Sequence, residues 1–287
     1  MMLNPVLRRE AKTSLRSWKT FIAITLYVAM ISAISILFIF SSMSYNSGFD
    51  PQDVIELFII LGSAQFVMIM LITPALAGGS ISGERERQTL DLLLITKMSP
   101  ISIILGKLFS SLGIVILMII STLPIFGVIF YFGGISVLSL LGLFAFLIII
   151  ACMVGAISIF FSTLFKKTVT SIVFVYLTLG FMGLGTLFID LLYNTIYWSV
   201  FEEYPPLLIS LILIIINPGI GFISLIDKII GSSIMSSRIV NSFSNIVGAK
   251  EAFIVKNFWC INIIMCVIIA AIFVFLASLC INVRKKK

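Results

Sequence analysis

The stretch GERERQTLDLLLITKMSP, residues 83–100, is a charged island between two long apolar segments. Ser82 stands directly before it as a candidate N-cap residue, because a serine hydroxyl accepts a hydrogen bond from a backbone amide of the first helical turn. Glu84 and Glu86 then fall in that turn, where the positive end of the helix dipole favours carboxylates. The pattern predicts a short amphipathic helix over residues 82–98, held at the membrane surface between two spans.

The spacing of charges within this stretch supports the helix. Arg87 and Asp91 are four residues apart, and Glu84 and Arg87 are three apart, so each pair can meet on one helix face. Ser99 and Pro100 are typical of an N-cap and a first helical position, so the next helix is expected to begin there.

The composition indicates a membrane protein. Of 287 residues, 60% are hydrophobic and 11% are charged, with a mean hydropathy of +1.23, whereas a soluble domain has about 25% charged residues. The net charge is +7, but the basic residues are divided among short loops, so no nucleic-acid partner is expected. The chain has no histidine, which removes histidine-based catalysis and histidine-ligated metals. We therefore expect no catalytic residues and no metal site.

The apolar segments predict an all-α polytopic membrane protein with six transmembrane helices, since each span needs about 20 apolar residues. The spans are expected at about residues 21–40, 57–77, 101–132, 137–165, 168–189 and 258–283. Residues 1–19 carry five basic residues and one acid, which favours an interfacial helix on the anionic cytoplasmic leaflet. The positive-inside rule places both termini in the cytoplasm of a multi-pass protein of the cell (plasma) membrane. We expect residues 1–287 to form a single transmembrane domain.

Residues 84–99 carry an ordered run of charged, threonine and leucine positions, and a glycine–lysine pair follows. This run resembles the E-R-E-x-G-T-L-(D/E)-L-L-L-x-T-x-(L/M)-S motif of the ABC-2 (type V) family of ABC-transporter permease subunits. The matching residues are Glu84, Arg85, Glu86, Thr89, Leu90, Asp91, Leu92, Leu93, Leu94, Thr96, Met98 and Ser99, then Gly106 and Lys107. Residues 4–10 also resemble the start of such subunits. The family's usual glycine is replaced by Gln88, which we expect to cost little because glutamine is a better helix former than glycine.

The resemblance implies the membrane subunit of an ABC exporter. Such a subunit lies in the lipid bilayer beside a second permease, identical or related, and ABC ATPase subunits bind the ATP and Mg. Residues 78–84 have the glycine spacing of a phosphate-binding loop, but Glu84 stands where that loop needs a lysine, and a carboxylate repels phosphate. We therefore expect no ATPase activity and no cofactor on this chain.

Residues 207–226 are apolar enough to span, but Asn217, Pro218 and Gly219 break them in the middle. Counting basic residues does not decide between a span and a re-entrant element, because both arrangements leave the same number on each side. The basic run 284–287 directly abuts the last span, and irregular backbone at membrane depth is tolerated where protein buries it. Type V exporters also place short re-entrant helices between spans five and six. We therefore expect a re-entrant element at 207–226.

A short helix between two rigid spans can sit in a groove of the ATPase and carry its closure into the membrane. The residues that we expect to make this contact are Glu84, Arg85, Glu86, Arg87, Thr89, Asp91, Leu92 and Leu93. The charged residues would pair with opposite charges on the ATPase, and the two leucines would supply the apolar anchor.

The substrate path is marked only by polar residues within the spans. The candidates are Gln65, Asn217, Thr25 and Tyr176, and each is also a candidate for a helix–helix hydrogen bond. A weakly polar passage suits an amphipathic or lipid-like cargo, or a peptide.

Two other functions stay open from the sequence. One is an ABC-type membrane assembly that serves signalling or an extracellular machine without bulk transport. The other is a membrane-embedded enzyme, which the missing histidine and the lack of paired intramembrane acids disfavour. The sequence does not give the cargo, the direction of transport or whether the partner permease is identical.

Overall fold

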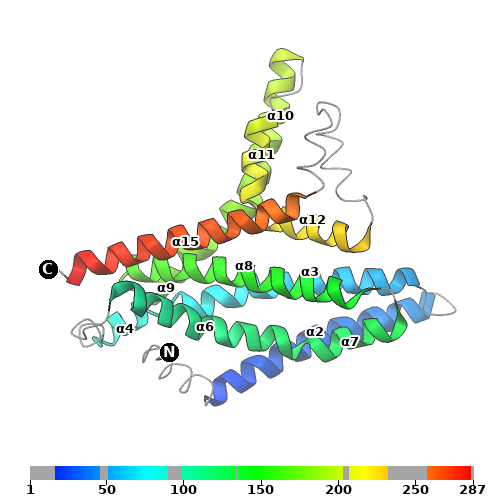
Figure 1. Ribbon diagram of the computed structural model, residues 1–287, viewed down its shortest axis with the longest axis horizontal. Coiled ribbons are helices and arrows are strands. Elements are labelled where there is room, and N and C mark those ends of the chain that lie inside the picture. Colours follow the sequence, from blue (N-terminus) through cyan, green and yellow to red (C-terminus); the bar gives the residue numbers. More distant parts are fainter. Residues whose placement is uncertain are drawn as a thin grey trace. The chain divides into compact units, whose positions relative to one another are not determined.

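The computed structural model describes residues 17–45, 51–89, 99–133, 135–202, 207–231 and 257–285, and their regular structure is entirely helical (Figure 1). The helices are α2 (Trp18–Tyr45), α3 (Pro51–Ala77), α4 (Ser82–Glu86), α6 (Pro100–Ser121), α7 (Leu123–Phe132), α8 (Val137–Leu164), α9 (Thr168–Gly180), the π-helix η1 (Phe181–Gly185), α10 (Thr186–Phe201), α11 (Leu207–Ile216), α12 (Pro218–Ile230) and α15 (Phe258–Lys285). Residues up to Val175 and from Ala270 onward form one compact unit, and Tyr176–Ile269 form another. The expected interfacial helix of residues 1–19 lies almost entirely outside the described residues.

Among the described residues, six helical runs are long and apolar enough to cross a membrane, in agreement with the six predicted spans, and the bent pair Ile209–Ile216 and Pro218–Ile230 would be a seventh if it spans. The fifth is longer than expected, because helical structure continues from Thr168 to Phe201 instead of ending near residue 189. Aromatic side chains one turn apart explain the extension. Tyr193 contacts Tyr197, and Tyr197 contacts Phe201, with ring centroids 6.0 and 4.6 Å apart, and such i,i+4 pairs stabilise a helix.

In the first unit α3 packs against α2, α6 and α8 (Figure 1). The rings of Phe58 on α3 and Phe126 on α7 meet edge-on at 6.2 Å, and Phe126 meets Phe144 on α8 at 5.3 Å. On α8, Gly155 faces α6 closely, since a Cβ added there would lie 3.0 Å from Leu108 Cδ1. A small residue therefore sets how near these two spans approach.

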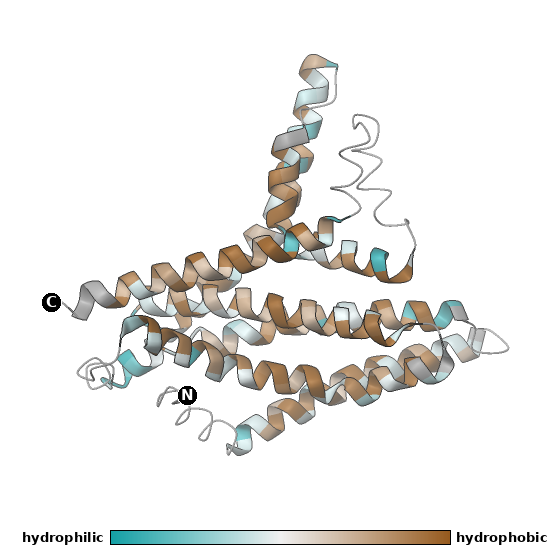
Figure 2. Cartoon of the chain, in the orientation of Figure 1, coloured by the Kyte–Doolittle hydropathy of each residue, from teal (hydrophilic) through white to brown (hydrophobic). Residues whose placement is uncertain are grey.

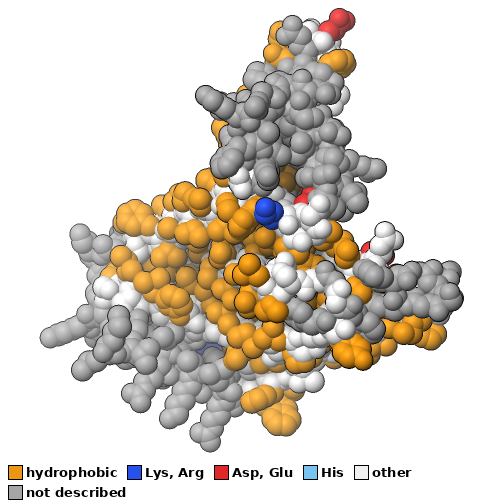
Figure 3. Space-filling model, turned by 45° about the vertical axis from the view of Figure 1, so that its right-hand side comes forward, with side chains coloured by type: hydrophobic (Ala, Val, Ile, Leu, Met, Phe, Trp, Pro, Cys, Tyr) orange, Lys and Arg blue, Asp and Glu red, His pale blue; other side chains and the backbone are white. Residues whose placement is uncertain are grey.

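Hydrophobic side chains dominate the outer faces of the long helices. Figure 2 shows hydrophobic residues along these helices and hydrophilic residues at α4. In the face seen in Figure 3, hydrophobic side chains cover much of the described surface and charged ones are few. Phe40, Leu138 and Val169 are each more than 70% exposed. Such a surface is costly in water and suits contact with lipid tails.

The third span is interrupted near Pro124, whose ring nitrogen has no hydrogen to donate. The helix breaks at Thr122, between α6 and α7. Thr122 Oγ1 donates to the backbone oxygen of Ile119 at 2.7 Å and accepts a hydrogen bond from Gln65 Nε2 at 3.0 Å. Gln65 is fully buried on α3, so this glutamine supports a helix break from inside the bundle.

In the second unit α11 and α12 are bent by 85° at Asn217. The Oδ1 atom of Asn217 accepts hydrogen bonds from the backbone amides of Gly219 and Ile220, at 2.9 and 3.4 Å. Asn217 is therefore the N-cap of α12, with Pro218 at the first helical position. A bent pair of this kind is either a broken span or a re-entrant loop.

A second asparagine holds the other side of the bend. Asn262 on α15 donates from Nδ2 to the backbone oxygens of Ile215 and Asn217, at 2.8 and 3.0 Å. The end of α11 leaves the Ile215 carbonyl without a helical donor, whereas that of Asn217 also accepts from the amide of Gly221 in α12, at 3.3 Å. Asn217 Nδ2 in turn donates to the backbone oxygen of Gly183 in η1, at 2.7 Å. The two side chains together fix the break of the helix pair and its contact with the π-helix.

Replacing Asn262 with leucine should destabilise the protein, because the part-buried carbonyl of Ile215 loses its donor at a cost of about 1–3 kcal/mol, and the buried carbonyl of Asn217 keeps the amide of Gly221 at 3.3 Å. The measurement is the thermal unfolding midpoint of the purified full-length chain in detergent. The matched control is Asn194→Leu, which removes a single bond to the backbone of Asp190 one turn away in α10. Equal midpoints for the two variants would show that the Asn262 contacts do not hold the bend.

Candidate functional site

The N-terminus of α4 is capped by another helix. The backbone amides of Ile81 and Ser82 both donate to Ser162 Oγ on α8, each at 2.9 Å. The prediction that Ser82 is the N-cap is wrong, since Ile81 holds that position. Ser82 Oγ instead donates to the backbone oxygen of Gly78, at 3.2 Å. The amides of Ile81 and Ser82 are therefore satisfied by α8, and that of Gly83 by the backbone oxygen of Gly79 at 2.9 Å.

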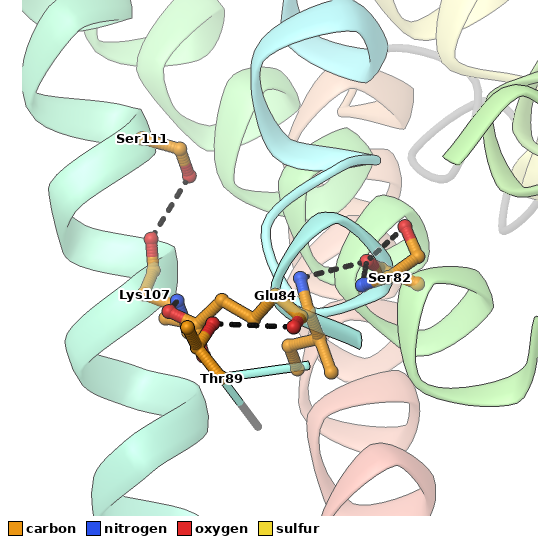
Figure 4. Close-up of polar contacts among 7 residues, drawn as sticks. Ser82, Glu84, Thr89, Lys107 and Ser111 are labelled. Carbon is orange, nitrogen blue, oxygen red and sulfur yellow. Dashed lines mark hydrogen bonds and ion pairs between the residues drawn. The ribbon is translucent and has the colours of Figure 1, made fainter. Parts of the chain in front are cut away.

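Glu84 ties α4 to α6. Its Oε1 atom lies 2.7 Å from Lys107 Nζ, and the two side chains point toward one another (Figure 4). The Lys107 side chain is 3% exposed and that of Glu84 is 25% exposed. An ion pair with so little exposure to water depends on both members. Removing one leaves the other charge buried without its ionic partner, which destabilises the protein by about 3–5 kcal/mol.

Arg85 ties α4 to the end of α8. Its two terminal guanidinium nitrogens donate to the backbone oxygens of Phe165 and Thr163, at 2.9 and 3.0 Å. These carbonyls stand at the C-terminus of α8, where helical partners run out and the helix dipole is negative. A cation is therefore well placed there.

Glu86 ties α4 to the start of α9. Its carboxylate accepts hydrogen bonds from the backbone amide of Thr168 at 2.7 Å and from Thr168 Oγ1 at 2.9 Å. Thr168 is the first residue of α9, where the helix dipole is positive. Arg85 and Glu86 thus place opposite charges against opposite helix ends. We call Glu84, Arg85 and Glu86, with the groups that they bind, the motif clamp.

The helix of the motif ends earlier than expected. The amide of Gln88 donates to the backbone oxygen of Arg85 at 3.1 Å, and that of Thr89 to the backbone oxygen of Glu84 at 2.9 Å. This pair of bonds is a Schellman motif, which closes a helix through a residue in the left-handed region. Gln88 is that residue, with φ of 58°.

Two predictions about this segment are therefore corrected. A continuous helix over 82–98 is wrong, because the chain leaves the helix at Gln88. The expectation from helix propensity that Gln88 costs little in place of glycine is also wrong. Its position favours glycine, the residue that adopts positive φ without strain. Residues 90–98 lie outside the described residues, and with them the expected contacts of Asp91, Leu92 and Leu93.

The glycines before the motif allow close packing on α9. A Cβ added at Gly78 would lie 2.6 Å from the Pro74 backbone oxygen and 2.9 Å from Ile172 Cγ1. A Cβ at Gly79 would lie 2.9 Å from Thr168 Cγ2. The glycines whose spacing resembles a phosphate-binding loop therefore leave room, by having no side chain, for the end of α3 to pack against the start of α9.

Eight residues of the motif were expected to contact the ATPase, and three of these, Glu84, Arg85 and Glu86, bind groups of their own chain. Glu84 forms an ion pair with Lys107, whereas the spacing in the sequence predicted Arg87 as its partner. Arg87 and Thr89 are exposed beside the clamp. Sequence reasoning missed Ser162 and Thr168 as partners. Both are ordinary polar residues near helix ends, and their pairing with α4 spans about 80 positions of sequence.

The four candidates for a substrate path differ in their surroundings. Gln65 and Asn217 are buried and support helix breaks through hydrogen bonds within their units. Thr25 on α2 and Tyr176 on α9 are exposed. Sequence reasoning missed Asn262, which the break at Asn217 could have indicated, since an interrupted helix needs a nearby donor for its last carbonyls.

A family model described as ABC-2 family transporter protein matches residues 56–279. No curated protein matches the sequence closely enough to count as a relative. The family match covers most of the chain, including the motif and its partners on α6, α8 and α9. The chain belongs to the ABC-2 family of transporter membrane proteins, which are non-catalytic transmembrane permease subunits of ABC transporters that work with an ATPase.

Replacing Gln88 with glycine should raise the stability of the chain by about 1 kcal/mol, because glycine adopts the left-handed conformation without the Cβ clash. The thermal unfolding midpoint in detergent measures it. The control is Arg87→Gly, at a neighbouring position with φ of −85°, where glycine should bring no gain. A lower midpoint for Gln88→Gly than for the natural chain would contradict the conformation assigned to Gln88.

Proposed function

We propose that this permease subunit is driven by ATP hydrolysis on a separate ATPase subunit and works as an exporter. In this proposal the motif clamp carries the movement of the ATPase into the spans. The observation that carries it is the set of bonds that joins α4 to three other helices, through Glu84, Arg85 and Glu86.

Physical coupling needs a segment that cannot move alone. A five-residue helix has too few internal bonds to be stable in isolation. Its ends and side chains are bonded to α8, α6 and α9 instead. A push on α4 is therefore shared among the ends of these spans, as in a rigid-body transition between two discrete states.

Export is the proposed direction because the motif resembles that of type V exporters. The bent pair α11–α12 lies where those exporters carry a re-entrant element, between the fifth and sixth spans, and supports the same proposal. The proposed assembly has two permeases, identical or related, and two ATPase subunits in the cell membrane, with both termini of this chain cytoplasmic.

The proposed cargo is amphipathic, lipid-like or a peptide. Two of the polar side chains within the described spans, those of Gln65 and Asn217, make hydrogen bonds that hold helix breaks. A passage whose polar groups are engaged in this way offers little to a strongly hydrated solute, since the solute must lose its hydration without compensation.

Replacing Glu84 with glutamine tests the function. We expect ATP-dependent movement of cargo to fall about tenfold or more, while the ATPase stays bound, because the buried Lys107 loses its ionic partner in the clamp. The assay uses proteoliposomes of the full complex, with a fluorescent phospholipid and a labelled amphipathic peptide as probes. The control is Glu56→Gln, which changes an exposed carboxylate on α3.

Full transport by the Glu84→Gln complex would remove the coupling role of the clamp. Transport of neither probe by the natural complex, with its ATPase active, would remove the proposed cargo class.

A further inference from the structure

Three polar side chains lie inside the apolar core of the first unit, at the break of the third span. They are Tyr27 on α2, Gln65 on α3 and Thr122 between α6 and α7. Gln65 and Thr122 are fully buried, and Tyr27 is 2% exposed. Each of the first three spans therefore contributes one polar side chain, and we call this group the polar centre.

The surroundings of the polar centre are apolar. On α2, Ile31 follows Tyr27 by one turn. On α3, Leu61 and Ile69 lie one turn before and one turn after Gln65. All three of these apolar side chains are buried. A polar atom in such a low-dielectric environment is costly unless it is hydrogen-bonded.

The direction of the hydrogen bonds determines what Gln65 still needs. Thr122 Oγ1 donates its proton to the backbone oxygen of Ile119, at 2.7 Å, so toward Gln65 it can only accept. The Gln65 Nε2 atom therefore faces Thr122, at 3.0 Å, and the Oε1 atom of the same amide is directed elsewhere. This Oε1 atom is buried and has no hydrogen-bond partner among the residues that the structure describes. It needs a donor.

The Tyr27 hydroxyl is a donor close to Gln65. The two side chains are near enough to interact. The hydroxyl oxygen is also buried, yet within the described part of the chain it makes no hydrogen bond of normal length and angle. A buried donor and a buried acceptor thus lie near one another, and protein groups satisfy neither.

We propose that one water molecule binds at the polar centre, where it accepts a hydrogen bond from the Tyr27 hydroxyl and donates one to Gln65 Oε1. Buried waters typically make about three hydrogen bonds to polar groups that protein atoms leave unsatisfied. With this water the donors all run in one direction, from Tyr27 through the water, Gln65 and Thr122 to the backbone oxygen of Ile119.

The water gives the Gln65 amide a fixed orientation. Its nitrogen is then held against Thr122, two residues before Pro124, where the third span is interrupted. Tyr27, on a different span, thereby becomes a positioning residue for the helix break. The first three spans share one hydrogen-bonded network at this place, and the water is its exchangeable member.

Replacing Tyr27 with phenylalanine tests the site, because it removes the hydroxyl and keeps the ring. The thermal unfolding midpoint of the purified full-length chain in detergent should fall by roughly 2–4 °C, since the water loses a donor and holds Gln65 less well. In a Gln65→Leu background the same replacement should cause no fall, because the acceptor that the water serves is gone. The matched control is Tyr197→Phe, which removes the hydroxyl of a half-buried tyrosine on α10 and should leave the midpoint unchanged in both backgrounds.

A density map of the natural full-length chain, at a resolution that shows ordered water, is the second measurement and needs no variant. We expect a water peak within hydrogen-bond distance of both Tyr27 Oη and Gln65 Oε1, and no such peak in the map of Tyr27→Phe.

A higher or unchanged midpoint for Tyr27→Phe would show that its hydroxyl is buried without a useful bond, and would overturn the proposal. An equal fall with and without Gln65 would also overturn it, because the two side chains would then share no ligand. A map with a direct bond between Tyr27 and Gln65 and no water peak would contradict it as well.

Discussion

Opposite partial charges meet where α8 ends and α9 begins, and the motif is built to match them. A turn of three residues brings the negative end of one helix close to the positive end of the next. Arg85 and Glu86 are consecutive, so one short helix can satisfy both ends at once. Glu84 then extends the same segment to Lys107 on α6. The position of α4 follows from these three contacts.

The second unit follows a related rule. A broken helix exposes backbone groups that lipid cannot satisfy, so side chains of neighbouring helices must do so. Asn217 and Asn262 fill this role at the bend between α11 and α12. In both units some polar side chains among the apolar helices bind backbone groups at helix ends, as Ser162 and Asn262 do. A polar residue within a span is therefore a weak guide to a substrate path.

The spans could be predicted from the sequence because apolar length alone determines them, and the break at Asn217 could be predicted from the proline and glycine after it. The clamp could not. Its partners on α8 and α9 are backbone atoms and common residues such as Thr168, which leave no mark at fixed spacing from the motif. The early end of α4 was missed for another reason. Helix propensity favours glutamine, and it gives no sign that the backbone at Gln88 is left-handed.

The central claim is that α4 moves as one body with the start of α9. Distances between nitroxide labels at Thr89 and Val169, two exposed positions on either side of the clamp, test it most directly in the full complex. The account predicts the same distance distribution in the nucleotide-free and ATP-trapped states. A distribution that shifts or broadens when ATP is trapped would show that the two segments separate during the cycle, and would contradict it.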